Sequence, residues 1–532
     1  MIGIREDADQ SADIDVLLER GQIVLPVRFH GAVLDIGPVL ATQGGSHYED
    51  YRHSLGGATP AAPEANRRLL ADLAVQMLLL LNARTVPLQL NHNLLRFSMA
   101  KGQPRTERLP LLRGQPLLAT LGAECRDRLT RQARIAVPSL NRVGTKTHEG
   151  HYAPENLAVA KELPVAIGQA ALHGGTAAAG IRTAVLLEVL ECAFGYRSTQ
   201  KDIASRLCPT GGNLGSPECL VLVKRNGQTS ILRYIPLKHQ LELVHSGAAR
   251  EEPAVADSIH VVCIGNREKT TRKYHEFGEN LACIDAGVAL AFFKNAAEVR
   301  GLAVTLDENG PIEPVLDEVL SLRTEYYRVM WTSQVSDAGL GPRLGGTCLG
   351  ARRKLEQRVA ARKACRLYDA SNVQMKMVVS LLREATPALS PGLREQALAQ
   401  LTVVIRARSG QRYHLHALTA GAAPSLLRLP LADAHHDTCL FMQTRLAEAP
   451  VQLFFLTPLH RILERHGPEG HDASLSVAGE WVARLWLRLA ENGLAGCPCG
   501  AVVEDDLLAQ LPPQFARHFN LFAFVFGRES AT

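Results

Sequence analysis

The feature that most constrains this chain is a weak internal repeat. Residues 259–303 align without a gap on residues 451–495, with a shift of 192 positions. Each copy consists of an apolar strand, a short charged turn and a long helix that ends in Gly-Leu-Ala. Seven aligned pairs are identical: Gly278/Gly470, Ala286/Ala478, Gly287/Gly479, Ala291/Ala483, Gly301/Gly493, Leu302/Leu494 and Ala303/Ala495. We interpret these stretches as two copies of one α+β unit, which can build inside one chain the cleft that a homodimer builds between two.

Composition bounds the class of protein. A length of 532 residues allows about three or four domains, and a 46% hydrophobic content is enough for sizeable cores. The net charge of +5 is mild for this length. It permits an acidic or phosphate-bearing partner without requiring nucleic acid.

Three further features predict a cytoplasmic protein without a membrane span. The eleven cysteines are an odd number scattered along the chain, which favours reduced thiols over a disulfide framework. The first residues are acidic and polar, so no signal peptide is visible. The apolar run at residues 69–82 is too short to cross a bilayer and is typical of a buried helix.

The sequence divides into five segments. We expect an N-terminal α+β module over residues 1–140, which could bind a peptide or partner, and an extended connector over 141–180. The first unit covers 181–335 and begins with a helix predicted over residues 179–207. A linker with a basic helix covers 336–370. That helix lacks interleaved aromatic residues, which favours a solvated face over a nucleic-acid groove. The second, degenerate unit covers 371–532.

Each unit also has a hairpin signal at the same place in its order of elements. Asn226-Gly227 separates two strand-like runs in the first unit, and Ser409-Gly410 does so in the second. Such dipeptides between apolar runs are typical of tight β-hairpins.

Three features of the first unit could carry chemistry. Arg197 and Ser198 follow a predicted helix, and a guanidinium beside a hydroxyl suits a phosphate group. Residues 208–213 (CPTGGN) form a proline-led turn whose glycines allow backbone N–H groups to approach a flat ligand. Lys273 and Tyr274 lie between a strand and the long helix, where they could point into an interfacial cleft. Each feature alone also has an ordinary structural explanation.

Taken in order, these features resemble a known family. The order comprises Arg-Ser, Pro-Thr-Gly-Gly-Asn, Tyr234-x-Pro236-x-x-His239-x-Leu241, Lys273-Tyr274 and a helix with Asp285-Ala-Gly287. It is similar to the nitroreductase superfamily and, within it, to the streptolysin-S-type (SagB-like) azoline dehydrogenase branch. The resemblance is good over residues 190–335 and faint over 375–530.

The resemblance implies a fold and a cofactor. The fold would be two fused nitroreductase-like α/β/α sandwich units in an intramolecular pseudo-dimer, of overall α+β class, with FMN at their interface. It assigns Arg197 and Ser198 to the phosphate and ribityl oxygens, and Lys273 and Tyr274 to catalysis. The residues beside the flavin ring would be Pro209, Thr210, Gly211, Gly212 and Asn213.

The second unit departs from this pattern. It lacks the Arg-Ser and Pro-Thr-Gly-Gly segments, and Arg465-His466 stands where the first unit has Lys273-Tyr274. By resemblance it offers Gly496, Pro498 and Gly500 against the flavin and Arg528 for the phosphate. Whether Arg197 and Arg528 serve the same cleft stays open.

The activity implied is the FMN-dependent oxidation of azoline rings to azoles in a ribosomally synthesised precursor peptide. Dioxygen would reoxidise the flavin, a cyclodehydratase is the expected partner, and further oligomerisation is left open. Lys273 could act as a base only if burial depresses its pKa, because an ordinary lysine is almost entirely protonated near neutral pH. Two alternatives remain: another flavin-dependent oxidoreductase of a small molecule, and a flavin-free scaffold that binds a peptide or enzyme.

No metal site is predicted. Cys497-Pro-Cys499 lacks a second Cys/His pair at a standard spacing, and the stretch His435–Cys439 is typical of a polar loop. The glycine-rich residues 339–350 lack the Lys-Ser/Thr of a phosphate-binding P-loop.

Overall fold

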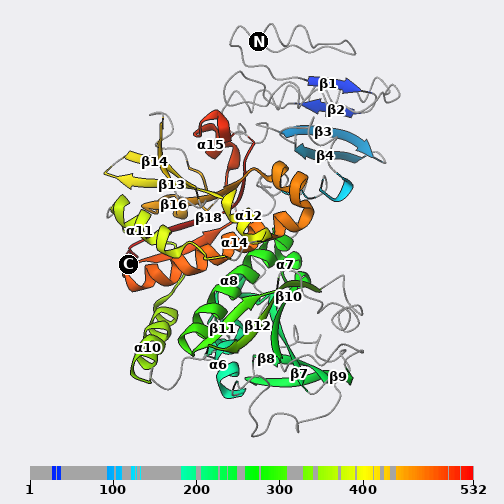
Figure 1. Cartoon of the computed structure of the whole chain (residues 1–532). Coiled ribbons are helices and arrows are strands. Elements are labelled where there is room, and N and C mark those ends of the chain that lie inside the picture. The colour runs from blue at the N-terminus through cyan, green and yellow to red at the C-terminus, as the bar shows by residue number, and fades with distance from the viewer. Residues whose placement is uncertain are drawn as a thin grey trace.

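The computed structural model consists of two similar α+β units and a small N-terminal sheet (Figure 1). The structure describes residues 27–30, 33–36, 93–100, 103–110, 122–125, 128, 132, 181, 183–198, 205–225, 228–236, 238–248, 258–274, 277–307, 327–338, 345–369, 373–389, 392–410, 412–419, 425–431, 439–441, 443–500, 502–515 and 517–530. The predicted connector at 141–180 and the Asn226-Gly227 turn lie outside these residues.

The first unit is a six-stranded antiparallel sheet with helices on one face. Its strands stand in the order β11-β12-β10-β7-β8-β9. Their bounds are β7 Pro217–Arg225, β8 Gln228–Ile235, β9 Gln240–Ala248, β10 Ser258–Asn266, β11 Leu302–Leu306 and β12 Tyr327–Asp337. The remaining elements are α6 Thr183–Phe194, β5 Tyr196–Ser198, β6 Ser205–Arg206, the 3-10 turn η5 Gly211–Asn213, α7 Arg267–Tyr274 and α8 Phe277–Val299.

The prediction of one helix over residues 179–207 is wrong in its second half. Helix α6 ends at Phe194, and the chain continues as β5, which pairs with β6. Gly195, a poor helix former, stands directly after the last turn. The Arg197-Ser198 segment therefore lies on a short strand rather than at a helix end.

The second unit has a sheet of the same size, in the order β15-β14-β13-β16-β18-β17. Its strands are β13 Thr402–Ser409, β14 Arg412–Thr419, β15 Leu426–Leu429, β16 Val451–Thr457, β17 Ala495–Cys499 and β18 Phe519–Gly527. Its helices are α11 Met375–Ala385, α12 Leu393–Ala399, α13 Thr444–Ala447, α14 Leu459–Glu491 and α15 Glu504–Ala509, with a 3-10 turn η9 at Pro513–Phe515.

The two sheets share one topology, which confirms the predicted α+β fold of two related units. Read from its other edge, the second sheet matches the first strand for strand, with β10 corresponding to β16 and β11 to β17. The long helices correspond as well. Helix α14 is broken at Gly467, where φ is +63°, and this break aligns with the junction between α7 and α8 in the first unit.

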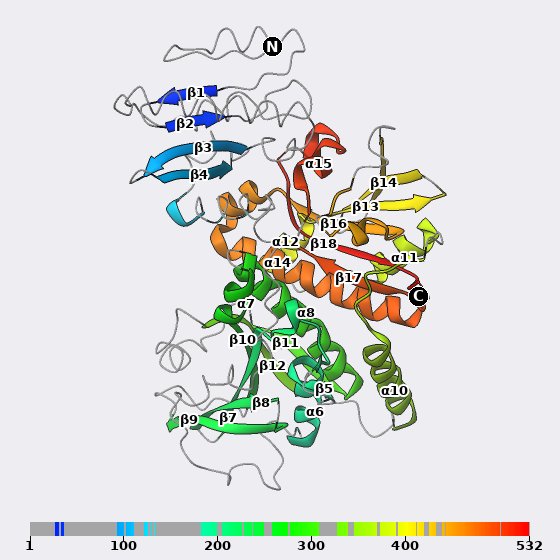
Figure 2. The same cartoon turned by 180° about the vertical axis from the view of Figure 1, so that it is seen from behind.

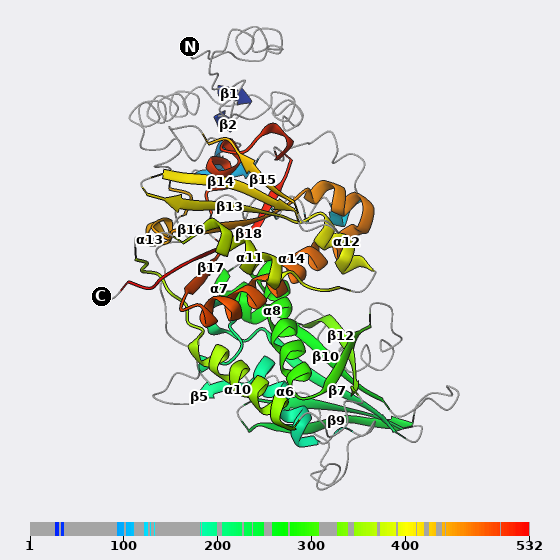
Figure 3. The same cartoon turned by 60° about the vertical axis from the view of Figure 1, so that its left-hand side comes forward.

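The repeated glycines mark the place where the units meet. Helices α8 and α14 lie side by side between the two sheets (Figures 1 and 3). A Cβ built on Gly287 would lie 1.9 Å from the Ser476 carbonyl oxygen, and one built on Gly479 would lie 2.2 Å from the Ile284 carbonyl oxygen. Ser476 aligns with Ile284 in the repeat, so each contact is the mirror of the other. This is the reciprocal pattern of a two-fold symmetric interface, here within one chain.

Two further segments join the units. Helix α10 (Gly345–Ala361) packs along α8 and α14 at one edge (Figure 2), and Leu355 and Val359 are buried there. The extended residues that follow pair with the second sheet, where Ala364 bridges Gly496. The chain therefore leaves the first unit and adds itself to the edge of the second.

The N-terminal sheet has the order β1-β2-β3-β4, with bounds β1 Val27–His30, β2 Val33–Ile36, β3 Asn93–Ala100 and β4 Gln103–Pro110. The segment after it contacts the seam between the units. Gln132 donates to the Asn520 carbonyl oxygen and accepts from Asn280, while Arg128 forms an ion pair with Asp472 at 2.9 Å.

Candidate functional site

The candidate site is organised by residues 208–216, here called the glycine loop, which connects β6 to β7. Two consecutive residues of the loop adopt positive φ: Gly212 at +60° and Asn213 at +59°. Glycine and asparagine are the residues that tolerate this region best. The Thr210 hydroxyl accepts a hydrogen bond from the Gly215 N–H at 2.9 Å, which closes the loop on itself. Pro209 and Thr210 are half-buried at its start.

Asp285 fastens the glycine loop to helix α8. Its carboxyl group accepts hydrogen bonds from the Gly211 N–H at 2.9 and 3.1 Å and from the Ser216 hydroxyl at 2.8 Å. Burial raises the pKa of Asp285 from 3.8 to about 7, although both hydrogen bonds oppose the rise. The loop is therefore held by an acid that titrates near neutral pH.

The predicted catalytic pair converges on the glycine loop. A Cβ built on Gly212 would lie 2.6 Å from the Tyr274 hydroxyl oxygen and 2.8 Å from Lys273 Nζ. The Lys273 ammonium lies 5.4 Å from the centroid of the Tyr274 ring. Burial lowers the pKa of Lys273, which raises the fraction of neutral amine. A side chain at this position would displace the pair and would also be strained by the positive φ.

The second unit approaches the same place through Gly500, which contacts Phe277 at the start of α8. The rings of Tyr274 and Phe277 meet edge to face, with centroids 6.4 Å apart. A Cβ built on Gly500, just after β17, would lie 2.5 Å from the Phe277 ring. The glycine loop, the Lys-Tyr pair and the exit of β17 therefore form one continuous set of contacts across the seam.

The other predicted residues of the second unit lie elsewhere. Gly496 packs beneath Phe524, where a Cβ would lie 2.3 Å from the ring, and Pro498 is exposed on β17. Arg528 is exposed beyond the end of β18. Because Ala495 pairs with Gly527, Arg528 lies at the start of β17, whereas Gly500 lies at its end, a strand length of about 16 Å away. The structure does not bring Arg528 to the glycine loop.

The side chains of Arg197 and Ser198 lie outside the described residues. Their backbone on β5 is one strand away from β6, which leads directly into the glycine loop. Their predicted contact with a phosphate stays a prediction.

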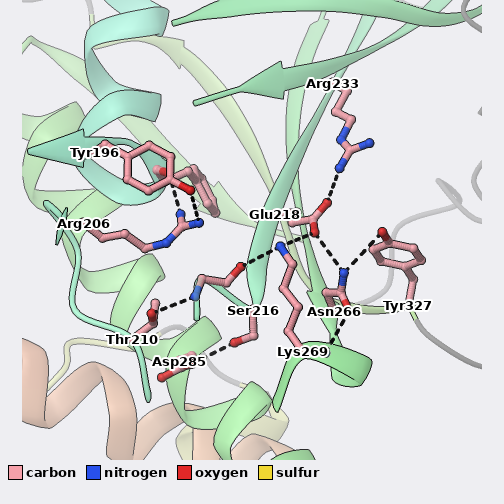
Figure 4. Close-up of polar contacts among 12 residues, drawn as sticks. Tyr196, Arg206, Thr210, Ser216, Glu218, Arg233, Asn266, Lys269, Asp285 and Tyr327 are labelled. Carbon is pink, nitrogen blue, oxygen red and sulfur yellow. Dashed lines mark hydrogen bonds and ion pairs between the residues drawn. The ribbon is translucent and has the colours of Figure 1, made fainter. Parts of the chain in front are cut away.

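The sequence analysis missed a buried cluster of charges next to the loop (Figure 4). The Glu218 carboxylate forms ion pairs with Arg233 at 2.6 Å and with Lys269 at 2.9 Å, and it accepts a hydrogen bond from Asn266. Burial alone would raise the pKa of Glu218, but these two cations and the hydrogen bonds lower it to about 2. The signal in the sequence was a glutamate at the start of an apolar strand.

Arg206 borders the same cluster from the other side. Its guanidinium donates to the Phe194 carbonyl oxygen and to the Tyr196 hydroxyl, and it lies 4.4 Å from the centroid of the Tyr196 ring. A Cβ built on Gly215 would lie 1.9 Å from its guanidinium carbon. Gly215 therefore leaves room for Arg206 behind the loop.

The Tyr-x-Pro-x-x-His-x-Leu motif has a structural explanation. The Tyr234 hydroxyl and His239 Nδ1 are hydrogen-bonded at 2.9 Å across the turn between β8 and β9. His239 adopts a positive φ of +48°, and Tyr234 pairs in register with Leu241. The motif therefore fixes this hairpin.

In the second unit, helix α12 stands where the first unit has its glycine loop. Arg394 on α12 is buried and donates to the Ser476 hydroxyl at 2.8 Å and to Glu480 at 2.6 Å. Lys294 from α8 reaches the same carboxylate at 3.1 Å. An arginine thus fills the position at which the first unit presents backbone N–H groups.

No group of three or more His, Cys, Asp or Glu side chains among the described residues could hold a metal ion. Among the helices described, none has the length and apolar character needed to span a bilayer.

Comparison with known proteins supports the fold. Residues 359–525 match the nitroreductase family. The match covers the second unit, whereas the motifs that carry the resemblance lie in the first. No curated protein matches the chain.

Solved structures give a consistent result. A protein from Anabaena variabilis described as a nitroreductase aligns with a TM-score of 0.54 at 12% identity, covering 65% of this chain and 88% of its own. That share of this chain exceeds either unit alone, so the shared fold includes the pair. Two others have lower scores. A chain of the E. coli McbBCD microcin synthetase complex aligns with a TM-score of 0.24 at 17% identity. The alignment covers 29% of this chain and 63% of that one. An NADPH:FMN oxidoreductase of Vibrio harveyi aligns with a TM-score of 0.23 at 15% identity. The alignment covers 33% of this chain and 69% of the oxidoreductase. Only the first score indicates a shared fold.

Proposed function

We propose that this chain is an FMN-dependent dehydrogenase that oxidises azoline rings to azoles in a ribosomally synthesised peptide. The observation that carries the proposal is the convergence at Gly212. A lysine amine and a tyrosine hydroxyl both reach a backbone position without a side chain, in a loop beside the seam between two nitroreductase-like units. A flat ligand beside such a loop would have proton-transferring groups at its edge.

The residues present fit FMN. The glycine loop supplies backbone that a ring system can approach closely, with Gly211, Gly212 and Asn213 as its ring-side residues and Pro209 and Thr210 leading into them. Cationic side chains, which suit a phosphate, are concentrated at the other end of the same loop at Arg206 and Lys269. When bound, FMN supplies the acceptor for the hydride that leaves the substrate ring.

The chain's own groups would handle the proton. Aromatisation of an azoline removes a hydride and a proton, and Lys273 is the base for the proton. Its pKa, lowered by burial, makes the neutral amine more accessible than in an exposed lysine. Tyr274, with its hydroxyl at the same point of the loop, would relay the proton or orient the substrate.

The proposal includes one flavin per chain. The first unit's loop has glycines at positions 211 and 212, whereas Arg394 of α12 occupies the corresponding position in the second unit. Purified protein should therefore be yellow, and flavin released by denaturation should approach one equivalent per chain. Two equivalents would contradict the assignment of α12, and a colourless protein that takes up no added FMN would contradict the proposed function.

The substrate class has its own test. The flavin-loaded protein would be incubated with a peptide that carries thiazoline or oxazoline rings. A mass loss of two hydrogens per ring supports the proposal. Flavin turnover without that change would indicate a flavin-dependent oxidoreductase of another small molecule, and absence of flavin would indicate a peptide-binding or partner-binding scaffold. A cyclodehydratase, which makes such rings, is the partner expected for this activity in the cytoplasm.

A further inference from the structure

A small hollow lies behind the glycine loop, on the side away from the seam. Its polar lining consists of Tyr196, Arg206, Glu218, Arg233, Tyr234 and Lys269. Figure 4 shows five of these side chains in two groups: Arg206 lies under the ring of Tyr196, and Arg233 and Lys269 are directed toward Glu218. We call this space the anion hollow.

The charges around the hollow do not balance. Three cations (Arg206, Arg233 and Lys269) face one carboxylate, that of Glu218. Arg206 donates only to neutral acceptors, a carbonyl oxygen and a hydroxyl. The lining itself carries two more positive than negative charges, and Asp285 and Glu242 interact with Arg206 and Arg233 from outside it. Such an excess is costly unless an anion accompanies it.

Arg233 provides a second, independent observation. Its side chain is almost completely buried, with 7% of the residue exposed. One guanidinium nitrogen, Nη2, donates to Glu218, but Nη1 has no hydrogen-bond partner among the described residues. A buried donor without a partner is destabilising, and more so when it is charged. It is therefore able to bind an oxygen atom that the described residues do not supply.

We propose that the anion hollow is a binding subsite for an oxyanion of the size of a phosphate or a carboxylate, held by Arg206, Arg233 and Lys269. Two parallel N–H groups of a guanidinium match the geometry of such a group, and Lys269 adds a point charge. Glu218 keeps Arg233 and Lys269 in place without neutralising both.

The location connects the subsite with the candidate active site. Lys269 and Lys273 are four residues apart on α7 and so lie on the same helix face, about 6 Å apart along the axis. Both lysines contact the glycine loop. Lys269 donates to the Gly215 carbonyl oxygen, and the Lys273 amine lies next to Gly212. A ligand whose reacting part lies at Gly212 could place an anionic end in the hollow. The anion could come from a flavin phosphate, which rests on the proposed function, or from a substrate carboxylate.

The first experiment uses flavin-free full-length protein and inorganic phosphate. Thermal unfolding is followed as sodium phosphate replaces sodium chloride at constant ionic strength. We expect a saturable rise in Tm for the unaltered protein. Arg233→Met and Arg206→Gln should weaken phosphate binding by about tenfold or more, the loss expected for one charge-assisted hydrogen bond. Arg206→Gln serves if Arg233→Met does not fold, because Arg206 contacts only neutral acceptors.

The matched control is Lys238→Met. Lys238 is exposed at the same β8–β9 hairpin, paired with Glu242, and its replacement removes the same charge outside the hollow. Phosphate binding should be unchanged in this variant. No saturable response in the unaltered protein, or equal binding by all variants, would overturn the subsite.

A second experiment identifies the source of the anion by comparing FMN with riboflavin, which lacks the phosphate, through quenching of flavin fluorescence. If the flavin phosphate occupies the hollow, Arg206→Gln weakens FMN binding by about tenfold but leaves riboflavin unchanged, and phosphate competes with FMN. If FMN and phosphate bind together, and acetate displaces the phosphate, the hollow serves a carboxylate. Phosphate binding without any flavin binding would retain the subsite and refute the proposed function. The reverse result would retain the function and refute the subsite.

Discussion

The first unit's glycine loop and the second unit's helix α12 occupy the same position in the same topology, yet they meet their long helices differently. In the first unit, Gly211 donates its backbone N–H to Asp285 on α8, and the loop itself has no side chain at Gly211 or Gly212. In the second, Arg394 inserts a guanidinium toward Glu480 on α14. One copy of a duplicated unit can thus keep a glycine loop while the other fills the same position with a packed helix.

The shared part of the comparison is the crossing of α8 and α14, and breaking it should have the largest effect. In Gly287→Leu the new side chain would meet backbone of α14, which cannot move aside as a flexible side chain could. We expect loss of folding, or a decrease of more than about 3 kcal/mol in the free energy of unfolding, beyond ordinary overpacking. Helix propensity alone would favour leucine by about 1 kcal/mol.

Urea unfolding of three variants tests this crossing. Gly479→Leu should behave like Gly287→Leu, because the two contacts are mirror images. Glu298→Leu adds the same side chain at an exposed position of α8 and should leave stability nearly unchanged. A stable Gly287→Leu protein would show that the units are not held by this close approach.

The difference between the units should appear next in activity. Lys273→Ala should reduce azoline oxidation by about 10²–10⁴-fold, the usual contribution of a general base, while flavin content stays the same. Arg465→Ala changes the aligned residue of the second unit, which is exposed, and should not alter the rate. In the unaltered enzyme the rate should rise with pH as Lys273 loses its proton, below the ordinary lysine range. Full turnover in flavin-loaded Lys273→Ala would rule out Lys273 as the base.

The fold was largely predictable because the repeat marks backbone requirements. Gly287 and Gly479 recur since no side chain fits where the helices cross, and Gly301 and Gly493 both adopt positive φ after their helices. Such constraints survive when most other positions have diverged. The family match to residues 359–525 fits the same view, because this unit retains the strand and helix pattern without the loop motif.

The site was predictable only in part. The meeting of Lys273, Tyr274 and Gly212 followed from the order of motifs in a resembling family. The Glu218 cluster was missed because it joins strands through sheet register: Leu220 pairs with Arg233, which brings Glu218 to the same face two residues away. Register depends on long-range pairing, and no local pattern reports it. Arg528 was assigned by position near the C-terminus, whereas strand pairing places it at the far end of β17.

A smaller effect tests the packing of the second unit. Glu480→Gln would leave Arg394 and Lys294 near the interior without their carboxylate partner, which should cost about 3 kcal/mol of unfolding free energy. Glu395→Gln, on the exposed side of α12, is the control. Adding Arg394→Met to Glu480→Gln should recover much of the loss. If Glu480→Gln leaves the free energy of unfolding unchanged, the Glu480 carboxylate does not hold α12 in place. The proposed difference between α12 and the glycine loop would then have less support.

The smallest expected effect concerns pH and the first unit's loop. Asp285 has a pKa of about 7 in the folded protein and an ordinary value of 3.8, so between these values the folded protein holds a proton that the unfolded chain has lost. The stabilising contribution of this proton is complete below about pH 4 and is lost as pH rises toward 7, at up to about 1.4 kcal/mol per pH unit. Asp285→Asn keeps an acceptor for Gly211 and removes the titration. The unfolding free energies of the unaltered protein and of this variant are measured in urea at pH 5 and pH 7. From pH 5 to pH 7, the unaltered protein should lose stability relative to the variant. The same difference at both pH values would mean that Asp285 does not hold its proton in the fold, and that the glycine loop is fastened by a permanently charged carboxylate.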